Sequence, residues 1–343
     1  MNTDTCIGKA QASASGSASH VRITHRNTTE VGEMAAYVHG WEQIYDQLTP
    51  GPFVGDFTEA WFDGIQIFRE QTSQSLQEHC RPWQGCLTVG IPLRMEGRSV
   101  YDGWEVDEHT QITIKPGEES LLRTPPALDL IAVALPMDEL TEFTRILEGN
   151  DAAEALARAP AALRDPAGST KLKEFLFSAL SSIISAPQLL EHEQLRRAMK
   201  HAIYESTVAS FGKAAAANQT PRTSSGRRQV VHRAVAYMRE HVNEPLSVAD
   251  LCAELGVSRR TLQYCFEEVL QLNPVGYLRA IRLNGVRRDL LNSDPEKTMI
   301  QDVAARWGFW HLSRLATEYR AMFGELPSAT LRGAAASPRH LNA

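Results

Sequence analysis

Two stretches near the carboxyl end of the chain repeat one order of apolar and polar positions. The first covers residues 247–274 and the second residues 299–327. With Gly256 aligned on Gly308, the apolar positions coincide before the glycine, and they coincide after it with a shift of one residue. Each stretch has the period of a short amphipathic helix, a turn at glycine and a second helix. The pattern predicts two helix-turn-helix units, of which the second has the longer turn.

The first half of the chain has the pattern of short strands. Apolar residues alternate or run together in 64–68, 85–93, 111–115 and 128–135, and Gly and Pro punctuate the intervals between them. Short strands at this spacing predict an antiparallel barrel or sandwich. A small barrel of this kind can enclose one small ligand.

After Pro136 the period becomes helical, over residues 137–147, 171–185 and 188–211. The third predicted helix carries a stripe of apolar or small side chains that needs a partner. Packing on its own domain and pairing across a homodimer both satisfy that need, and both stay open. The stripe consists of Leu195, Met199, Ala202, Ile203 and Ser206.

Changes of composition divide the chain into five segments. Residues 1–25 are small and polar and are expected to be a disordered tail. Residues 26–212 form the β-rich domain with its following helices, and residues 213–226, with Pro, Gly, Ser and Ala, read as a linker. Residues 227–332 form the all-α domain with both helix-turn-helix units, and residues 333–343 are expected to be a tail.

The second helix of the first unit has one apolar and one polar face. Leu262, Phe266 and Val269 follow the helical period and are expected to face the core. The outward positions are candidate DNA contacts, because Arg can read guanine and Gln can read adenine in the major groove. These candidates are Arg259, Arg260, Gln263 and Tyr264.

The corresponding helix of the second unit presents smaller polar side chains. Leu315, Tyr319 and Met322 are expected to face inward. The outward face suits methyl contacts, phosphate contacts and shape reading, so we expect the first unit to supply most base discrimination. The candidate DNA contacts of the second unit are Ser313, Arg314, Ala316, Thr317 and Arg320.

Capping patterns predict where the helices begin. Ser247 with Asp250, and Thr298 with Gln301, have the spacing of a capping box at the start of each unit. Asn273 and Pro274 start a long helix that ends near Leu291 and joins the units. Two units on one face of B-DNA should lie about one helical turn apart, roughly 34 Å.

The charge distribution favours DNA as the partner of the carboxy-terminal domain alone. The net charge of the chain is −6. Residues 1–226 carry 19 Lys and Arg against 29 Asp and Glu, a net charge of −10, whereas residues 227–332 carry 15 against 12, a net charge of +3. All but one of those 15 cations are Arg, which binds phosphate and guanine through two parallel hydrogen bonds.

Residues 227–332 resemble the DNA-binding domain of the AraC/XylS transcriptional regulators. The resemblance lies in GVSRRTLQY (256–264), YLRAIRL (277–283), VAARWGF (303–309) and FGELP (323–327). It implies base-reading positions at Arg260, Gln263 and Tyr264 and at Ser313, Ala316 and Thr317. Gln271 stands where relatives have glycine. Residues 308–311 and 85–93 look closest to the ethanolamine-operon regulator branch, which implies a β-rich sensor, here taken as a cupin-like barrel.

No sequence pattern indicates catalysis or a bound metal. The five cysteines, Cys6, Cys80, Cys86, Cys252 and Cys265, form no CxxC pair. Cys252 and Cys265 lie on apolar helix faces and are expected to be packed thiols, which fits a reducing cytoplasm. His79 with Cys80 and Cys86 is too small a set for a zinc site. No apolar run is long enough to span a bilayer. We therefore expect no cofactor, no metal and no membrane partner. An apolar pocket, if present, would be lined by Trp61, Phe68, Trp83, Tyr101 or Trp104.

These patterns favour a cytoplasmic, sequence-specific transcription regulator that binds double-stranded DNA. The resemblance implies an activator that contacts RNA polymerase and answers to a small-molecule effector, whose binding residues the sequence does not identify. Two alternatives stay open. One is an enzyme whose helices serve assembly, and the other is a regulator without an effector, controlled by abundance or by oxidation of Cys80 and Cys86.

Overall fold

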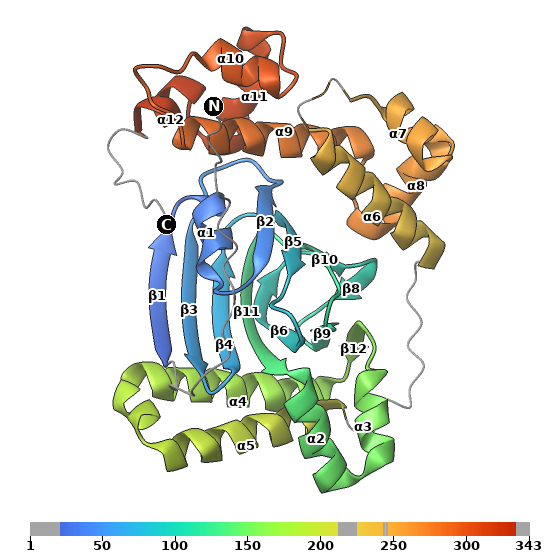
Figure 1. The fold of residues 1–343 in the computed structure, drawn as a ribbon. Coiled ribbons are helices and arrows are strands. Elements are labelled where there is room, and N and C mark those ends of the chain that lie inside the picture. The colour runs from blue at the N-terminus through green and yellow to red at the C-terminus, as the bar shows by residue number, and fades with distance from the viewer. Residues whose placement is uncertain (1–20, 212–224, 243, 245, 334–343) are drawn as a thin grey trace, which may run out of the picture.

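A computed structural model describes residues 21–211, 225–242, 244 and 246–333. A β-rich domain lies on one side of a long helix, α9 (Pro274–Leu291), and the other carboxy-terminal helices are arranged along that helix (Figure 1). Most of the predicted linker and most of both predicted tails lie outside the described residues. Residues 22–25 are an exception: they belong to strand β1, which pairs with β3, and not to a disordered tail.

The β-rich domain consists of two antiparallel sheets. The first contains, in spatial order, β1 (Arg22–Thr28), β3 (Gly55–Phe62), β4 (Ile65–Thr72), β11 (Ala127–Pro136), β6 (Cys86–Glu96), β9 (Thr110–Ile114) and β12 (Ala162–Arg164). The second contains β2 (Glu42–Gln47), β5 (Leu76–Arg81), β10 (Ser120–Arg123), β7 (Ser99–Tyr101) and β8 (Trp104–Val106). Among the described residues no strand pairing joins the two sheets, so the predicted β-rich fold is confirmed but the cupin-like barrel is not closed.

Strand β11 shows why the central strands read as continuous apolar runs. Ile131, Val133 and Leu135 face a core shared with the helices that cover the first sheet, whereas Leu130 and Ala132 face the space between the sheets. A strand buried on both faces has no polar side, so its hydrophobicity does not alternate. The four predicted strand segments correspond to β4, β6, β9 and β11.

Helices close the outer face of the first sheet and the end of the domain. The covering helices are α4 (Pro166–Ser185) and α5 (Glu193–Phe211), and Ile203 of α5 is buried in their shared core. The apolar stripe of α5 therefore packs largely on its own domain, although Leu195 stays exposed. The remaining elements are α1 (Val31–Tyr37), α2 (Met137–Glu148), α3 (Asn150–Ala157) and the 3-10 helix η1 (Pro187–Glu191).

The carboxy-terminal domain has two cores that share α9. Tyr277 and Ile281 belong to the core of the first helix-turn-helix unit, and Val286 and Leu290 to the core of the second. One rigid helix therefore fixes the two units relative to each other. The other helices are α6 (Ser225–Glu240), α7 (Val248–Leu255), α8 (Arg259–Leu270), α10 (Ile300–Arg306), α11 (Leu312–Phe323) and α12 (Pro327–Gly333).

Polar contacts fasten the two domains along one side of α9. Asp46 of β2 is fully buried and pairs with Arg239 at 2.8 Å and with Arg288 at 2.9 Å. Next to it, the Gln47 backbone N–H donates to Asn284 Oδ1, and Asn284 Nδ2 donates to the Gln47 carbonyl. A buried carboxylate held by two guanidinium groups is costly to separate, because each partner left alone would be an unpaired buried charge.

Candidate nucleic-acid interface

The first unit is a helix-turn-helix with a well-capped start. Ser247 and Asp250 form the predicted capping box ahead of α7. Gly256 ends α7 with φ 65°, a left-handed conformation that glycine adopts without steric cost. Ser258 then caps α8 by accepting a hydrogen bond from the Thr261 backbone N–H.

Helix α8 divides its side chains as the sequence predicts. Leu262, Phe266 and Val269 are buried, and all four candidate contacts are exposed. The Arg260 guanidinium lies 5.4 Å from the Tyr264 ring centre and donates to its hydroxyl at 3.2 Å. Gln263 donates to Glu267 at 2.9 Å. These contacts hold long polar side chains in place on the exposed face before any ligand is bound.

The second unit begins differently from the prediction. Its first helix, α10, has Met299 as N-cap residue without a side-chain hydrogen bond, so the Thr298–Gln301 capping box is wrong. The chain enters the helix one residue later than the spacing suggests, and Gln301 lies in its first turn. Gly308 takes φ 75° in the loop that precedes α11. The second unit therefore has the weaker start.

Helix α11 presents a smaller polar face than α8. Ser313, Arg314, Thr317 and Arg320 are exposed, whereas Ala316 is half-buried. The Thr317 hydroxyl donates to the Ser313 carbonyl, so part of its capacity is used within the helix. On the inner side Leu315 and Tyr319 are buried as expected, but Met322 is only half-buried, and Phe323 is buried in its place.

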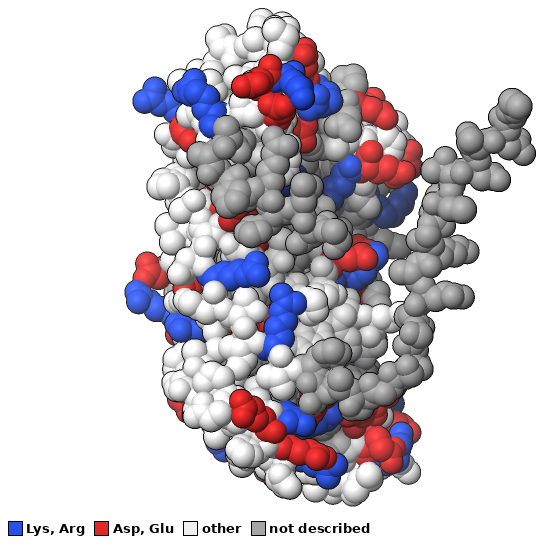
Figure 2. Space-filling model, turned by 60° about the vertical axis from the view of Figure 1, so that its left-hand side comes forward, with Lys and Arg blue, Asp and Glu red and all other residues white. Residues whose placement is uncertain are grey.

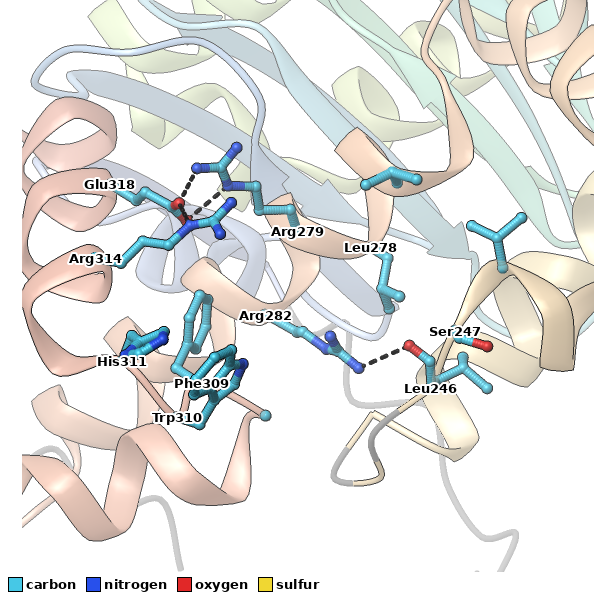
Figure 3. Close-up of a pocket in the computed structure, with 13 residues that line it drawn as sticks. Leu246, Ser247, Leu278, Arg279, Arg282, Phe309, Trp310, His311, Arg314 and Glu318 are labelled. Carbon is cyan, nitrogen blue, oxygen red and sulfur yellow. Dashed lines mark hydrogen bonds and ion pairs between the residues drawn. The ribbon is translucent and has the colours of Figure 1, made fainter.

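A cleft of about 290 Å³ separates the two units above α9 (Figure 3). Arg279 of α9 and Arg314 of α11 both point at Glu318, and the Arg314 Nε–Glu318 Oε1 distance is 2.7 Å. Two guanidinium groups around one carboxylate leave a net positive charge at the cleft. Burial alone would raise the pKa of Glu318, but the hydrogen bonds from these two arginines outweigh it and lower that pKa.

The third arginine of the cleft, Arg282, stabilises the fold through hydrogen bonds to the backbone. Arg282 donates through Nη2 to the carbonyls of Glu244 and Leu246, at 3.1 and 3.2 Å. These carbonyls lie just before α7, so Arg282 ties the connecting helix to the first unit. Its desolvation lowers its pKa. Arg279 and Arg314 are thus the cleft arginines with exposed side chains.

Sequence reasoning missed one prominent residue of the second unit. Trp310 is 82% exposed at the mouth of the cleft, and its ring centre lies 3.5 Å from that of His311. A hydrophobic pattern assigns large aromatic side chains to a core, so it gives no reason to expect Trp310 at the surface. An exposed Trp offers an indole N–H donor and a flat face, both of which suit contact with a nucleic acid backbone or sugar.

The β-rich domain binds the carboxy-terminal ends of α8 and α11, the second helices of the two units, which are called recognition helices below. Arg123 Nη1 donates to the carbonyls of Leu270 and Gln271 at the end of α8, each at 3.0 Å. The Gly51 backbone N–H and Gln47 Nε2 donate to the Met322 carbonyl near the end of α11. Helix ends carry free carbonyls and partial negative charge, so donors there are stabilising. The first helix has a charged donor and the second neutral ones.

On the face shown in Figure 2, the described arginines do not form one extended basic surface. Lys and Arg side chains lie there beside Asp and Glu side chains in small mixed groups (Figure 2). Arg287 pairs with Glu30 and Glu325, and Arg306 with Asp289. Within the described part of the chain, Arg259, Arg260 and Arg320 have no acidic partner. These three are the candidate contacts whose charge is uncompensated.

The described ranges contain neither a cluster of metal-binding side chains nor a helix suited to cross a membrane. Within the described ranges no three His, Cys, Asp or Glu side chains lie close enough together to hold a metal ion. His79 pairs with Glu119 at 2.9 Å. None of the described helices combines the length and the apolar character needed to cross a membrane.

The carboxy-terminal domain is similar to domains of known proteins. Residues 251–333 match the model of a family described as "Helix-turn-helix domain". The chain is 42% identical over 103 residues to the "Probable thc operon regulatory protein" of Rhodococcus erythropolis, covering 30% of this chain and 31% of that protein. It is 38% identical over 99 residues to "XylDLEGF operon transcriptional activator 2" of Pseudomonas putida, covering 29% of this chain and 63% of that protein.

These matches cover less than two thirds of the relatives' own length. Among solved structures, that of the AraC-like transcriptional activator CuxR aligns with 82% of this chain over its full length, at 18% identity and a TM-score of 0.40.

Proposed function

We propose that the chain is a sequence-specific transcription regulator that reads double-stranded DNA with two helix-turn-helix units. The observation that carries this proposal is the pair of exposed polar helix faces, on α8 and α11, mounted on one connecting helix. The curated relatives of the same domain are named as operon regulators and transcriptional activators. Those names favour a regulator over an enzyme with a helical assembly domain.

The length of α9 suits the binding of the two units to neighbouring major grooves. Its 18 residues span about 27 Å at 1.5 Å per residue. We expect the recognition helices, which lie near its two ends, to enter major grooves about one turn of B-DNA apart, roughly 34 Å. Arg279 and Arg314 at the cleft between the units would face the intervening backbone and bind phosphate.

We assign base discrimination mainly to α8. Arg260, Gln263 and Tyr264 are exposed on α8 and offer hydrogen bonds that distinguish bases. Ser313, Ala316 and Thr317 on α11 have short side chains, which suit contact with methyl groups and with the backbone. Arg259, Arg314 and Arg320 are assigned to phosphate.

The β-rich domain is proposed to be the effector sensor. It contacts the carbonyl ends of both recognition helices, so a shift of β10 would reach α8 and a shift of β2 would reach α11. Coupling between effector and DNA is reciprocal, because each ligand changes the affinity for the other by the same factor. By resemblance the regulator is an activator that contacts RNA polymerase. Its placing in the ethanolamine-operon branch and the possibility of a homodimer stay predictions.

The thiol-responsive alternative finds less support. Cys80 and Cys86 are both buried. Burial raises the pKa of Cys80 well above its usual range and that of Cys86 to about 11. Thiols react with oxidants through the thiolate, so protonated, buried thiols are slow sensors. Reporter output that changes in a Cys80→Ser, Cys86→Ser variant under oxidant would restore this alternative.

Footprinting of the full chain across the genome, followed by electrophoretic shifts at fixed salt, tests the proposal. We expect an operator with two half-sites about one helical turn apart. Inserting five base pairs between them would rotate one half-site to the opposite face of the DNA and should abolish two-unit binding. Protection of single, unspaced sites only, or binding insensitive to the insertion, would contradict the arrangement of two units on one rigid helix.

A further inference from the structure

A small cavity lies inside the β-rich domain, between the two sheets. Its volume is about 40 Å³, which exceeds the roughly 10–15 Å³ that one water molecule needs. Strands from both sheets contribute to its wall, and the residues furthest apart in sequence are Trp41 and Ala132. The cavity is separate from the DNA-reading faces of α8 and α11.

Two buried carboxyl groups line this cavity. Glu70 of β4 is 2% exposed and Glu78 of β5 is 3% exposed. Glu70 accepts a hydrogen bond from the Tyr45 hydroxyl at 3.2 Å through Oε2. Tyr45 in turn lies opposite Glu78 in the pairing of β2 with β5. The carboxyl groups thus approach the same tyrosine from the two sheets.

The remaining acceptor capacity of these groups is unused. Glu70 Oε1 and Glu78 Oε1 are buried and accept no hydrogen bond. Among the described residues that line the cavity, none is Lys, Arg or His. A buried acceptor without a partner costs about 1–3 kcal/mol, and more when it is charged. A ligand that supplies donors to these oxygens would therefore be stabilised.

Aromatic rings form the rest of the wall. Trp41 and Phe68 meet edge to face with ring centres 5.5 Å apart, and Tyr45 and Tyr101 also line the cavity. The faces of such rings attract cations through their quadrupole. Acidic oxygens together with aromatic rings are the usual surroundings of a bound organic cation.

We propose that this cavity binds a small organic cation with N–H groups, such as a primary ammonium or an amidinium, and that Glu70 and Glu78 accept its hydrogen bonds. An anion would meet two acidic groups, and a neutral hydrocarbon would leave both oxygens unpaired. The small volume limits the ligand to a compact molecule or to a compact head group. That this ligand is the effector rests on the proposed function, whereas its binding does not.

The protonation of the apo cavity agrees with this chemistry. Burial raises the pKa of Glu70 to about 7, and burial together with the neighbouring Glu70 raises the pKa of Glu78 well above its usual range. The other titratable groups around them, Tyr45, Cys80 and Tyr101, also have raised pKa values because of burial and are uncharged. A bound cation would favour the carboxylate forms, so its uptake should release protons.

Two strands connect the cavity directly to the DNA-binding domain. On β2, Tyr45 faces the cavity and its neighbours Asp46 and Gln47 bind α6, α9 and α11. On β10, Leu122 faces the cavity and the next residue, Arg123, binds the end of α8. A ligand that moves these strands therefore acts on both recognition helices.

Binding is tested on the full chain without DNA, by thermal unfolding and titration calorimetry. The probes are ethylammonium and acetamidinium chloride, compared with ethanol, sodium acetate and sodium chloride at equal ionic strength. We expect a saturable rise in Tm with a cationic probe only, and proton release measured from the buffer dependence of the binding heat. An equal rise with ethanol or acetate would overturn the proposal.

Variants separate the cavity from the protein surface. Glu78→Gln should weaken the cation at least tenfold without loss of folding, because it removes an unpaired buried acid. Glu70→Gln provides a second test if that variant does not fold. Glu42→Gln changes an exposed carboxyl on the same strand as Tyr45 and should leave binding unchanged. Undiminished binding in both cavity variants would refute the site.

A second readout distinguishes this inference from the proposed function. If the cation binds but the affinity for the footprinted operator does not change, the cavity is a site without effector coupling. If the operator is bound and no cationic probe binds, the ligand class is wrong and the regulator stands. If neither operator nor cation binds, both proposals fail.

Discussion

The two helix-turn-helix units share one sequence pattern, but they differ in the capping of their helices and in the side chains on their exposed faces. The first has a capping box, a short turn and a face of long polar side chains, and a charged side chain caps its recognition helix. The second has an uncapped start, a longer loop and a face of short side chains. In addition, the second unit has the exposed Trp310 and lies beside the two cleft arginines, Arg279 and Arg314, which offer further contacts to DNA. The repeated sequence pattern thus gives both units the same helix-turn-helix backbone, while the exposed side chains determine which DNA contacts each unit can make.

The largest predicted effect comes from disrupting the packing of the second unit against α9, which leaves the first unit intact. The Trp307 ring packs over Gly285 of α9, and a Cβ at Gly285 would lie 2.1 Å from that ring. Gly285→Ala should lower the free energy of unfolding by roughly 1–3 kcal/mol or more, the cost of overpacking. Urea denaturation measures this cost. Footprints should lose the half-site of the second unit first.

Gly226→Ala is the matched control, since a Cβ at Gly226 would meet nothing within 4 Å. It should leave the stability and both footprints unchanged. Simultaneous loss of both half-sites in Gly285→Ala would show that the units do not act as separate readers.

The next effect compares the two reading faces directly. Arg260→Ala with Gln263→Ala should weaken specific binding by roughly 30-fold or more, because each good two-bond base contact discriminates by about 1–3 kcal/mol. Ser313→Ala with Thr317→Ala should weaken it less than about fivefold. Electrophoretic shifts on the operator and on unrelated DNA of equal length separate specific from general binding. Equal losses from the two double variants would contradict the assignment of α8 as the main reader.

A smaller change should strengthen the second unit. Glu318→Gln removes the negative charge between Arg279 and Arg314 and nearly keeps the shape of the side chain, while one of the two accepting oxygens becomes an NH2 group that cannot accept from arginine. The freed arginines should raise affinity a few-fold and steepen the salt dependence of binding by about one phosphate contact. Glu267→Gln is the counterpart on the first unit, where no arginine pair is released, and should leave the salt slope nearly unchanged. A slope unaltered by both variants would place the cleft away from the DNA backbone.

The smallest effect concerns the caps and depends on pH. Hydrogen bonds with Ser247 lower the pKa of Asp250. A carboxyl with a lowered pKa stabilises the fold above its ordinary pKa, and this stabilisation is lost as the pH falls through its folded-state value, below about pH 4. Helix α7 should therefore fray in acid while α10, which has no side-chain cap, is unaffected by this titration. Carbon chemical shifts of both helices follow the change, and Asp250→Asn should show a weaker pH dependence in α7.

The sequence predicts the two domains unequally well, for a physical reason. In the carboxy-terminal domain almost every buried position is apolar, so helical periodicity identifies Leu262, Phe266 and Tyr319. In the β-rich domain polar side chains are buried as well, among them Gln77 and Glu78 on β5 and Asp46 and Gln47 on β2. Their burial removes the alternation that marks a strand, and for Asp46 and Gln47 it is explained by the distant partners Arg239 and Asn284.

The same limit applies to the sites. The exposed faces of α8 and α11 follow from periodicity, because a residue opposite the core must face solvent. Of the aromatic residues expected at an apolar pocket, Phe68 and Tyr101 line the cavity, while Trp61, Trp83 and Trp104 lie elsewhere and are half-buried. Glu70 and Glu78 carry no mark in the sequence, since an isolated glutamate in a strand ordinarily faces water.

The paired hydrogen bonds between Asn284 and Gln47 have a further consequence for how the domains can be handled. Strand β2 is an edge of its sheet, and the carboxamide of Asn284 donates to and accepts from the Gln47 backbone as the peptide of a neighbouring strand would. A helix side chain thereby occupies the backbone groups of Gln47, with which another chain could otherwise pair. Cutting the protein between its domains would uncover that edge, so a truncated β-rich domain should self-associate through β2 unless the edge is blocked.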